Sequence, residues 1–190
     1  MAFRSFRATL EVIYGWGSME YLAELKAARA FIVADETMKK LGYLGRAKRL
    51  LRRARVQVAQ FTGVTPEPDI KCVGRGVALC RKFKPRVIIG LGGGSVLDAT
   101  KAIRIFYEHP RLRFEEIHCS LGPPKRSIPP FRKTVQISIP ATSGTGSDVS
   151  ASSMVTDSGL KLKCLIFDPN LFPETVILDY ELPLSMPPAL

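Results

Sequence analysis

The chain has 190 residues, 46% of them hydrophobic, which is enough to bury the core of one domain and excludes an intrinsically disordered protein. No apolar stretch approaches the length that crosses a bilayer, and the basic start MAFRSFRATL lacks the apolar core of a signal peptide, so no membrane association is expected. The four cysteines form no Cys-x-x-Cys pair, and we expect reduced thiols in a cytoplasmic protein.

The chain is strongly basic, with 28 lysine and arginine residues against 17 acidic ones and a formal net charge of +11. Much of the excess lies on one predicted helix, residues 37–55. A basic surface attracts phosphates of any kind, nucleic acid included. Because no nucleic-acid module or interleaved aromatic residue accompanies this helix, a solvated face is the favoured interpretation, and a nucleic-acid partner is not expected.

Strands and helices alternate along the chain, which is typical of an α/β fold with a doubly wound, mostly parallel, Rossmann-like sheet. We treat residues 1–190 as one domain, in which strands alternate with helices over Ala30–Ala34, Thr37–Arg55, Val56–Phe61, Asp69–Phe83, Val87–Leu91 and Ser95–Tyr107. Clustered proline, glycine and charged residues indicate an irregular connection over 108–133. Later strands are expected at Val135–Ile139 and Thr175–Leu178, and between them a β-hairpin with strands Ser152–Thr156 and Lys161–Phe167 that turns at Asp157–Gly159.

The most informative segment is VIIGLGGGSVLDATK, residues 87–101, where a buried strand, a glycine loop and a helix start follow one another. Consecutive glycines let the backbone approach a ligand closely, and the first amides of a helix point outward at any anion. Ser95 is a suitable N-cap, and Asp98, three residues later, completes a variant of the capping box. The loop therefore predicts a phosphate site, and a tight turn that binds nothing is the alternative.

The spacing of these residues excludes three other motifs. A P-loop requires Gly-Lys-Ser/Thr at the helix entrance, whereas Lys101 lies well inside the helix without a preceding glycine. The dinucleotide fingerprint G-x-G-x-x-G fails because Ser95 or Leu97 occupies the position of its third glycine. The sequence contains no G-x-S-x-G, which removes the main argument for a hydrolase with a nucleophile elbow.

A second loop of small residues follows the strand Val135–Ile139 and has the sequence PATSGTGSD over residues 140–148. Hydroxyl groups and glycines alternate there without a bulky side chain, so the loop can wrap around a polar ligand. Its hydroxyls are suited to bond ribose, phosphate or carboxamide groups, although a surface turn has the same composition.

These motifs occur in an order that resembles the N-terminal half of the iron-containing (group III) alcohol dehydrogenases. The resemblance is carried by GLGGGSVLDATKAI, then ISIPATSGTGSDVS and then FPETVILDYELPLSMPP, and it extends from about Tyr14 to Pro188. Upstream, YGWGSMEYL, AFIVADETMKKLG and FTGVTPEPDIKCV resemble the entry segment, the first cofactor strand and the segment after the second strand. A chance match to several ordered motifs is much rarer than a match to any one of them.

The resemblance implies an α/β domain that binds NAD(H) or NADP(H), followed by a helical domain that holds a divalent metal, usually iron or zinc. Such enzymes interconvert alcohols with aldehydes or ketones by hydride transfer. Asp35 would contact the adenosine ribose, Thr142 and Thr145 the nicotinamide side, and Lys161, or else Lys163, stands where a family lysine approaches the cofactor. The remaining cofactor-binding residues implied by similarity are Gly92, Gly93, Gly94, Ser95 and Asp98.

Asp35 also predicts which dinucleotide is preferred. At the end of the strand Ala30–Ala34, its carboxylate can accept hydrogen bonds from the ribose hydroxyls and would repel a 2′-phosphate, so we expect NAD rather than NADP. The alternative is that Asp35 only caps the helix that follows it.

Several features depart from the family pattern. The chain ends at Leu190, before the family segment that would supply the first metal ligand, so we expect no metal-binding or catalytic residue in it. The only histidines, His109 and His118, match no family ligand position and are interpreted as exposed loop residues. Glu67 stands where the family usually has asparagine, and Asp148 replaces a glutamate.

Two functional interpretations remain open. The first is the dinucleotide-binding domain of a metal-dependent alcohol dehydrogenase, inactive by itself, with a helical metal domain or a homo-oligomer partner and a small alcohol or aldehyde as substrate. The second is a nucleotide-binding or basic nucleic-acid-associated module that acts without redox chemistry. Under the first interpretation, an apolar surface is expected around Val176–Leu184 and Met186–Leu190, where the helical domain would pack.

Overall fold

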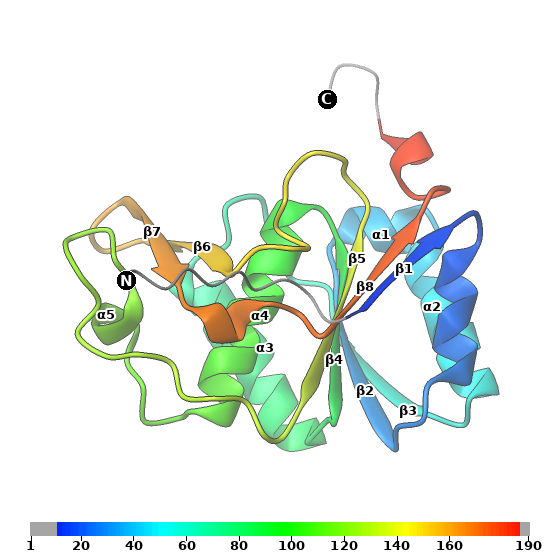
Figure 1. Cartoon of the computed structure of the whole chain (residues 1–190), viewed down its shortest axis with the longest axis horizontal. Helices are drawn as coiled ribbons and strands as arrows, with labels where there is room; N and C mark the ends of the chain where they lie inside the picture. The colour runs from blue at the N-terminus through cyan, green and yellow to red at the C-terminus, as the bar shows by residue number, and fades with distance from the viewer. Residues whose placement is uncertain (1–10, 187–190) are drawn as a thin grey trace, which may run out of the picture.

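Six parallel strands form the central sheet of the computed structural model, which describes residues 11–186 (Figure 1). Their order across the sheet is β1-β8-β5-β4-β2-β3. The doubly wound α/β fold with a parallel sheet, expected from the sequence, is confirmed. In the order β1, β2, β3, β4, β5 and β8, the strands span Glu11–Gly15, Arg29–Val33, Gln57–Phe61, Val87–Gly92, Val135–Pro140 and Thr175–Asp179.

The connections between these strands contain helices and one antiparallel hairpin. The hairpin strands β6 and β7 span Ser152–Asp157 and Leu162–Phe167. In chain order, η1, α1, α2, α3, α4, α5, η2 and η3 span Ser18–Glu24, Glu36–Lys40, Tyr43–Arg53, Ile70–Phe83, Gly94–Glu108, Phe114–Ile117, Pro169–Leu171 and Pro183–Ser185. No helix of residues 11–186 is long and apolar enough to cross a membrane.

Helices cover both faces of the sheet (Figure 1). The core with α3 and α4 includes Phe31 and Ile88, whereas the core with η1 and α2 includes Ile32 and Ile89. Successive residues of a strand point to opposite faces, so β2 and β4 bury apolar side chains on both sides. This burial explains why their sequences are continuously apolar instead of alternating.

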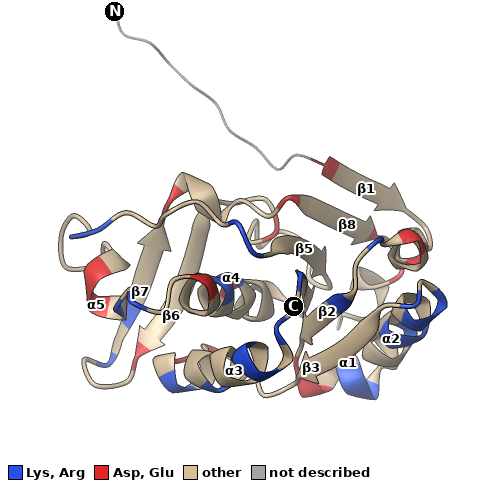
Figure 2. Ribbon diagram, turned by 90° about the horizontal axis from the view of Figure 1, so that it is seen from below, with Lys and Arg blue, Asp and Glu red and all other residues tan. Residues whose placement is uncertain are grey.

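The predicted helix over 37–55 is broken into α1 and α2. Gly42 lies at the junction with φ +82°, a left-handed conformation that glycine adopts without strain and that a continuous helix excludes. Figure 2 shows lysine and arginine on α1, α2 and α3. Part of this charge is compensated, since Arg46 lies 3.8 Å from Glu20 and 3.9 Å from Asp179.

The predicted hairpin is confirmed, but its turn is longer than expected and lies one residue later. The Asp157 carboxylate accepts the N–H groups of Gly159 and Leu160, at 2.8 and 3.1 Å, which stabilises a turn over 158–161. Lys161 therefore belongs to the turn, with φ +53°, and not to a strand. The predicted irregular connection over 108–133 contains one short helix, α5.

The sequence does not predict the edge strand β1, whose residues are mostly exposed and lack a clear apolar pattern. Strand β1 pairs with β8, which therefore lies inside the sheet and buries Val176 and Ile177 completely. The expectation of an apolar surface over Val176–Leu184 is wrong for these two residues and for Leu182, which is also completely buried. Tyr180 and Leu184 are exposed, at 43% and 72%, and the part of the expected surface at 187–190 lies outside the described residues.

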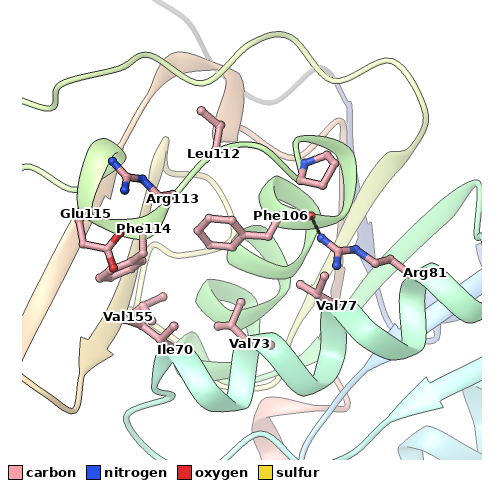
Figure 3. Close-up of a pocket in the computed structure, with 12 residues that line it drawn as sticks. Ile70, Val73, Val77, Arg81, Phe106, Leu112, Arg113, Phe114, Glu115 and Val155 are labelled. Atoms are coloured by element: carbon pink, nitrogen blue, oxygen red, sulfur yellow. Dashed lines mark hydrogen bonds between the residues drawn. The ribbon is translucent and has the colours of Figure 1, made fainter.

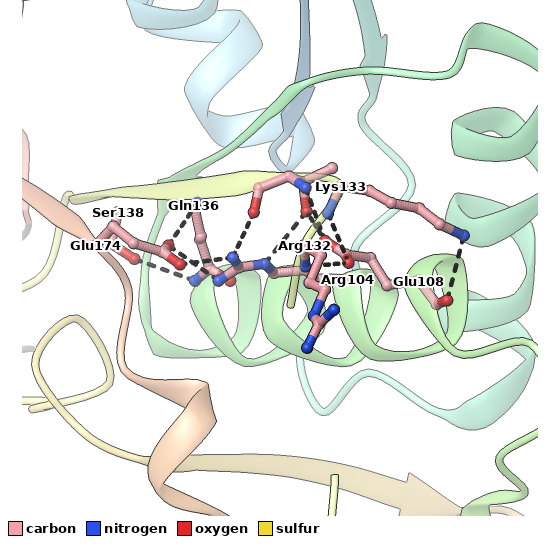
Figure 4. Close-up of polar contacts among 8 residues, drawn as sticks. Arg104, Glu108, Arg132, Lys133, Gln136, Ser138 and Glu174 are labelled. Atoms are coloured by element: carbon pink, nitrogen blue, oxygen red, sulfur yellow. Dashed lines mark hydrogen bonds and ion pairs between the residues drawn. The ribbon is translucent and has the colours of Figure 1, made fainter. Parts of the chain in front are cut away.

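A buried polar network fixes the amino end of β5 (Figure 4). Arg104 of α4 is 1% exposed and donates to both carboxylate oxygens of Glu174, at 2.6 and 2.9 Å, and to Thr134. One turn further, Glu108 accepts three backbone N–H groups of residues 132–134 and the Thr134 hydroxyl. Burial by itself raises the pKa of Glu108, but these hydrogen bonds outweigh it and hold the pKa below its ordinary value.

Glu108→Gln should lower the free energy of unfolding by about 1–3 kcal/mol, because a carboxamide presents a donor where the carboxylate accepts backbone N–H groups. The loss should be largest above pH 4.5 and shrink as the pH falls, since a carboxyl with a lowered folded-state pKa stabilises the fold only while ionised. Urea denaturation from about pH 3 to about pH 7 measures this difference. Glu115→Gln, at an exposed position of α5, is the control, and a loss that stays constant down to the lowest pH contradicts the assignment.

Candidate functional site

The carboxyl ends of β2, β4 and β5 meet at one edge of the sheet, where the strand order reverses. The chain continues from β2 to β3 on one side and from β4 to β5 on the other, so the strand order reverses between β2 and β4, the position at which doubly wound sheets generally have a ligand-binding crevice. Asp35 follows β2, the glycine loop follows β4, and the loop PATSGTGSD follows β5. Three predicted segments that are distant in sequence therefore lie at the same edge.

The turn from β4 into α4 is built from glycine backbone. Gly92 has φ +152°, and Gly93 is the N-cap of α4. The Gly93 carbonyl accepts the N–H groups of Val96 and Leu97, at 2.9 and 3.1 Å, so the two helical amides before them remain to meet an anion. The prediction of Ser95 as N-cap is wrong, because the helix begins one residue earlier and places Ser95 inside its first turn.

The loop after β5 packs directly onto this turn. A Cβ built at Gly93 would lie 3.0 Å from the hydroxyl oxygen of Thr142, and a Cβ at Gly94 would lie 3.3 Å from atoms of Thr145 and Ser147. Side chains at either glycine would push the loops apart. The structure thus brings four of the predicted site residues together, and a Cβ at either glycine would be in tight contact with the second loop.

Asp35 lies just beyond the carboxyl end of β2 and caps α1. Its Oδ1 accepts the N–H of Met38 at 2.8 Å, and the side chain is half-buried. A carboxylate has two oxygens and about four lone-pair positions, so one capping bond leaves acceptor capacity for ribose hydroxyls. The cap that the sequence offered as an alternative role is therefore present and compatible with ligand binding.

Asp98 points into the protein, and the predicted capping box is not formed. Burial raises the pKa of its carboxyl, although the N–H of Met154, the charge of Lys101 and the hydroxyl of Ser147 oppose the rise. Its backbone carbonyl accepts the hydroxyl of Ser153 at 2.8 Å. Asp98 thus connects α4 to β6 and to the loop after β5.

Lys101 is a buried cation that sequence patterns do not single out. Its ammonium donates to the carbonyl oxygens of Ser150 and Ser152, at 2.7 and 2.8 Å, and to the Ser150 hydroxyl at 3.2 Å. Burial lowers the pKa of Lys101 to about 8, against the opposing charges of Asp98 and Asp148. These hydrogen bonds hold the chain after the second loop against α4. The one feature of the sequence that could have indicated this role is a lysine in the first half of a largely apolar helix.

A cavity of about 160 Å³ lies beside the glycine turn and includes Ser95 and Asp98 in its lining. Lys163 of β7 also lines this cavity, where its ammonium lies 2.5 Å from the Glu67 carboxylate. Lys161 is exposed in the hairpin turn and is not among the lining residues. Of the two candidate lysines, the geometry favours Lys163 for contact with a ligand at this turn.

Two further cavities differ in chemical character. One of about 230 Å³ lies where β5 and β8 end and has Thr142, Asp148, Asp179 and Tyr180 among its lining residues. Another of about 430 Å³ lies between α3, α4 and α5 and is lined mainly by apolar side chains (Figure 3). Only the smaller of these two contains a predicted site residue.

The interpretation of His109 and His118 as exposed loop residues is wrong, because neither residue is exposed. The ring of His118 is buried and lies 5.3 Å from that of Phe114, and the half-buried ring of His109 lies 5.4 Å from that of Phe131. Burial lowers the pKa of His109. Aromatic packing inside the 108–133 connection buries them both, and residues 11–186 contain no group of three His, Cys, Asp or Glu residues that could hold a metal ion.

The strand order and the helices on both faces define a doubly wound α/β protein, a fold class that commonly binds nucleotides where the strand order reverses. Residues 9–180 match the family model of the iron-containing alcohol dehydrogenases. The chain belongs to this family, as the resemblance of its motifs implies.

Individual relatives show how much of the family's length is present. The chain is 37% identical to the NADPH-dependent butanol dehydrogenase of Clostridium saccharobutylicum, over 97% of this chain and 47% of the relative. It is 36% identical to an alcohol dehydrogenase of Thermococcus barophilus, over 96% and 48% respectively. The solved iron-containing alcohol dehydrogenase of Thermococcus thioreducens matches with a TM-score of 0.89 and 36% identity, over 97% and 49%. The chain spans about half the length of these relatives and corresponds to their N-terminal half.

The buried ammonium predicts a pH dependence of stability. Between pH 8 and pH 10.5 the unfolded chain keeps a proton at Lys101 that the folded chain releases, so the free energy of unfolding should rise with pH in this window. The rise through this group should reach at most about 3 kcal/mol. Denaturation of the parent and Lys101→Met across the window measures it as the difference between two curves. Lys161→Met, at an exposed position, should follow the parent, and a flat difference for Lys101→Met contradicts the buried charge.

Proposed function

We propose that residues 1–190 form the dinucleotide-binding domain of a metal-dependent alcohol dehydrogenase, an oxidoreductase that interconverts alcohols with aldehydes or ketones. The observation that carries this proposal is the close contact between the two glycine-containing loops at the crevice, where a Cβ at Gly93 would lie 3.0 Å from Thr142. A turn without side chains, closed by a loop of hydroxyl groups, offers a ligand mainly backbone amides and hydroxyls. Such a surface suits a dinucleotide.

In this proposal, the first amides of α4, from Gly94 and Ser95, bind the pyrophosphate of NAD(H), whose nicotinamide supplies the hydride chemistry. The glycine conformation at Gly92 turns the strand end toward that helix start. Thr142 and Thr145 offer hydroxyls toward the nicotinamide side. A lysine of the hairpin contacts the cofactor. The family resemblance favours Lys161 for this role, and the lining of the cavity favours Lys163.

Asp98 and Lys101 act in this proposal as positioning residues. Both are buried, and both bond to the chain that follows β5. They therefore hold the second loop against the glycine turn. Asp98 also lines the cavity beside this turn, so the cofactor contact that the family resemblance implies for it remains part of the proposal.

The metal of the family does not fit the described part of this chain, since residues 11–186 contain no suitable ligand group. We assign the iron or zinc to the helical domain of the complete enzyme, because the chain covers about half of each relative. That domain, or a second copy of the chain, is the proposed partner, and a small alcohol or aldehyde the proposed substrate. Four free cysteines support a reducing compartment, the cytoplasm.

NAD(H) should bind more tightly than NADP(H), by roughly 5- to 150-fold, because the Asp35 carboxylate repels a 2′-phosphate. The relative from Clostridium saccharobutylicum is an NADPH-dependent enzyme, so the opposite preference is the outcome to test against. Asp35→Asn removes the charge, keeps an oxygen for the Met38 N–H and should narrow the ratio. Calorimetric titration of both proteins with both cofactors measures it. A parent that prefers NADPH, or an unchanged ratio in the variant, shows that Asp35 is not the selector.

This chain alone should hold no stoichiometric divalent metal after dialysis and should oxidise no alcohol. The reason is the ligand set of residues 11–186, which offers scattered carboxylates that would exchange an ion freely. Metal analysis by mass spectrometry and an assay of NADH formation check the two statements. A full-length iron-containing relative treated in the same way is the positive control. One tightly held iron or zinc per chain is the result that contradicts this prediction.

A further inference from the structure

A charged pair stands at the rim of the cavity beside the glycine turn. Glu67 belongs to the connection between β3 and α3, and Lys163 belongs to β7, yet their charged groups lie 2.5 Å apart. Both residues line the same cavity of about 160 Å³ as Ser95 and Asp98 of α4. The carboxylate of Glu67 therefore borders the space next to the helix start that we propose as the pyrophosphate site.

The backbone holds Glu67 in this position. Glu67 stands between Pro66 and Pro68 and has φ +56°, a left-handed conformation that few non-glycine residues adopt. The carbonyl oxygen of Pro68 accepts the N–H of Thr156 at 2.9 Å, which ties this connection to β6. The flanking prolines and this bond restrict the backbone on both sides of Glu67, so rotation of the Glu67 side chain is the simplest way for its carboxylate to leave the rim.

The pair changes what an anionic ligand meets at this rim. The positive charge of Lys163 is already compensated by Glu67, so it attracts a phosphate less than a free ammonium does. The negative charge of Glu67 also repels the phosphate directly. Both effects act in the same direction and oppose the binding of a diphosphate.

We propose that Glu67 lowers the affinity of this domain for dinucleotides by holding Lys163 and by repelling the pyrophosphate. The inference rests on the proposed function, because it concerns the same ligand at the same glycine turn. On binding, the ammonium of Lys163 exchanges the carboxylate for a phosphate oxygen, and the Glu67 side chain turns to solvent. The side chains of Glu67 and Lys163 are 62% and 57% exposed, so this exchange disturbs no buried contact.

The size of the effect follows from this exposure. Exposed ion pairs are weak and are screened by salt, so removal of the Glu67 charge should tighten dinucleotide binding by about 3- to 10-fold at low salt. The gain should decline at high salt, because the screening length falls from about 10 Å at about 0.1 M to about 3 Å at about 1 M.

The test compares the parent chain with Glu67→Gln, which removes the charge and keeps the size of the side chain. Glu115→Gln removes the same charge from α5 and is the matched control, since Glu115 is exposed and does not line this cavity. Calorimetric titration with NADH at about 50 mM and about 500 mM NaCl gives the affinities. Thermal unfolding verifies that all three proteins are folded.

Tighter NADH binding by Glu67→Gln alone, with a gain that declines at high salt, supports the proposal. Equal affinity of the parent and Glu67→Gln overturns it and leaves the proposed function standing. An equal gain in Glu115→Gln also overturns it, because the effect then reflects net charge alone. If all three folded proteins fail to bind NADH, the proposed function and this inference fall together.

Discussion

The arrangement of the site depends on the charged side chains that α4 buries along one face. Lys101, Arg104 and Glu108 follow one another at intervals of three and four residues, and each is at most 5% exposed. Buried charges are costly unless they are paired and hydrogen-bonded, so each of them dictates where other segments must lie. Lys101 requires the carbonyls after the second loop, Arg104 requires Glu174 before β8, and Glu108 requires the backbone before β5. One helix thereby fixes the amino ends of β5, β6 and β8 relative to its own first turn.

The first turn of α4 begins with glycines, which carry no side chain. The polar contacts place the loop after β5 on the helix start. The fit is close, since a Cβ built at Gly93 would lie 3.0 Å from the hydroxyl oxygen of Thr142. The loop therefore packs against backbone, and its hydroxyls come close to the amides that precede the first intrahelical bonds. The buried charges hold the second loop against α4, and the glycine backbone at the helix start leaves room for its close approach. Both features contribute to the contact between the two loops.

Local composition predicted much of this structure, and tertiary contacts account for the rest. The strands β2 and β4, the glycine turn and the hairpin follow from apolar runs and glycine positions, which are properties of short segments. Strand β1 pairs with β8, more than 150 residues away, and no local pattern reports such a partner. Lys101 was not assigned to the site because its acceptors are mainly carbonyl oxygens, which every residue has. The exposed state expected for His118 failed because its ring packs on Phe114 of the same connection and its backbone pairs with Ile166, a contact that no local pattern reports.

Charge acts on two different steps of the binding that we propose. The net charge of +11 acts over the whole surface and favours the approach of any anionic dinucleotide, which raises association rates. Asp35 and Glu67 act at the site itself, where they alter the bound state and hence mainly the dissociation rate. Long-range attraction favours the more highly charged NADP(H), whereas the carboxylate at the end of β2 opposes its extra phosphate. In the binding that we propose, selection between the two cofactors would therefore reside in how long each stays bound and not in how quickly it arrives.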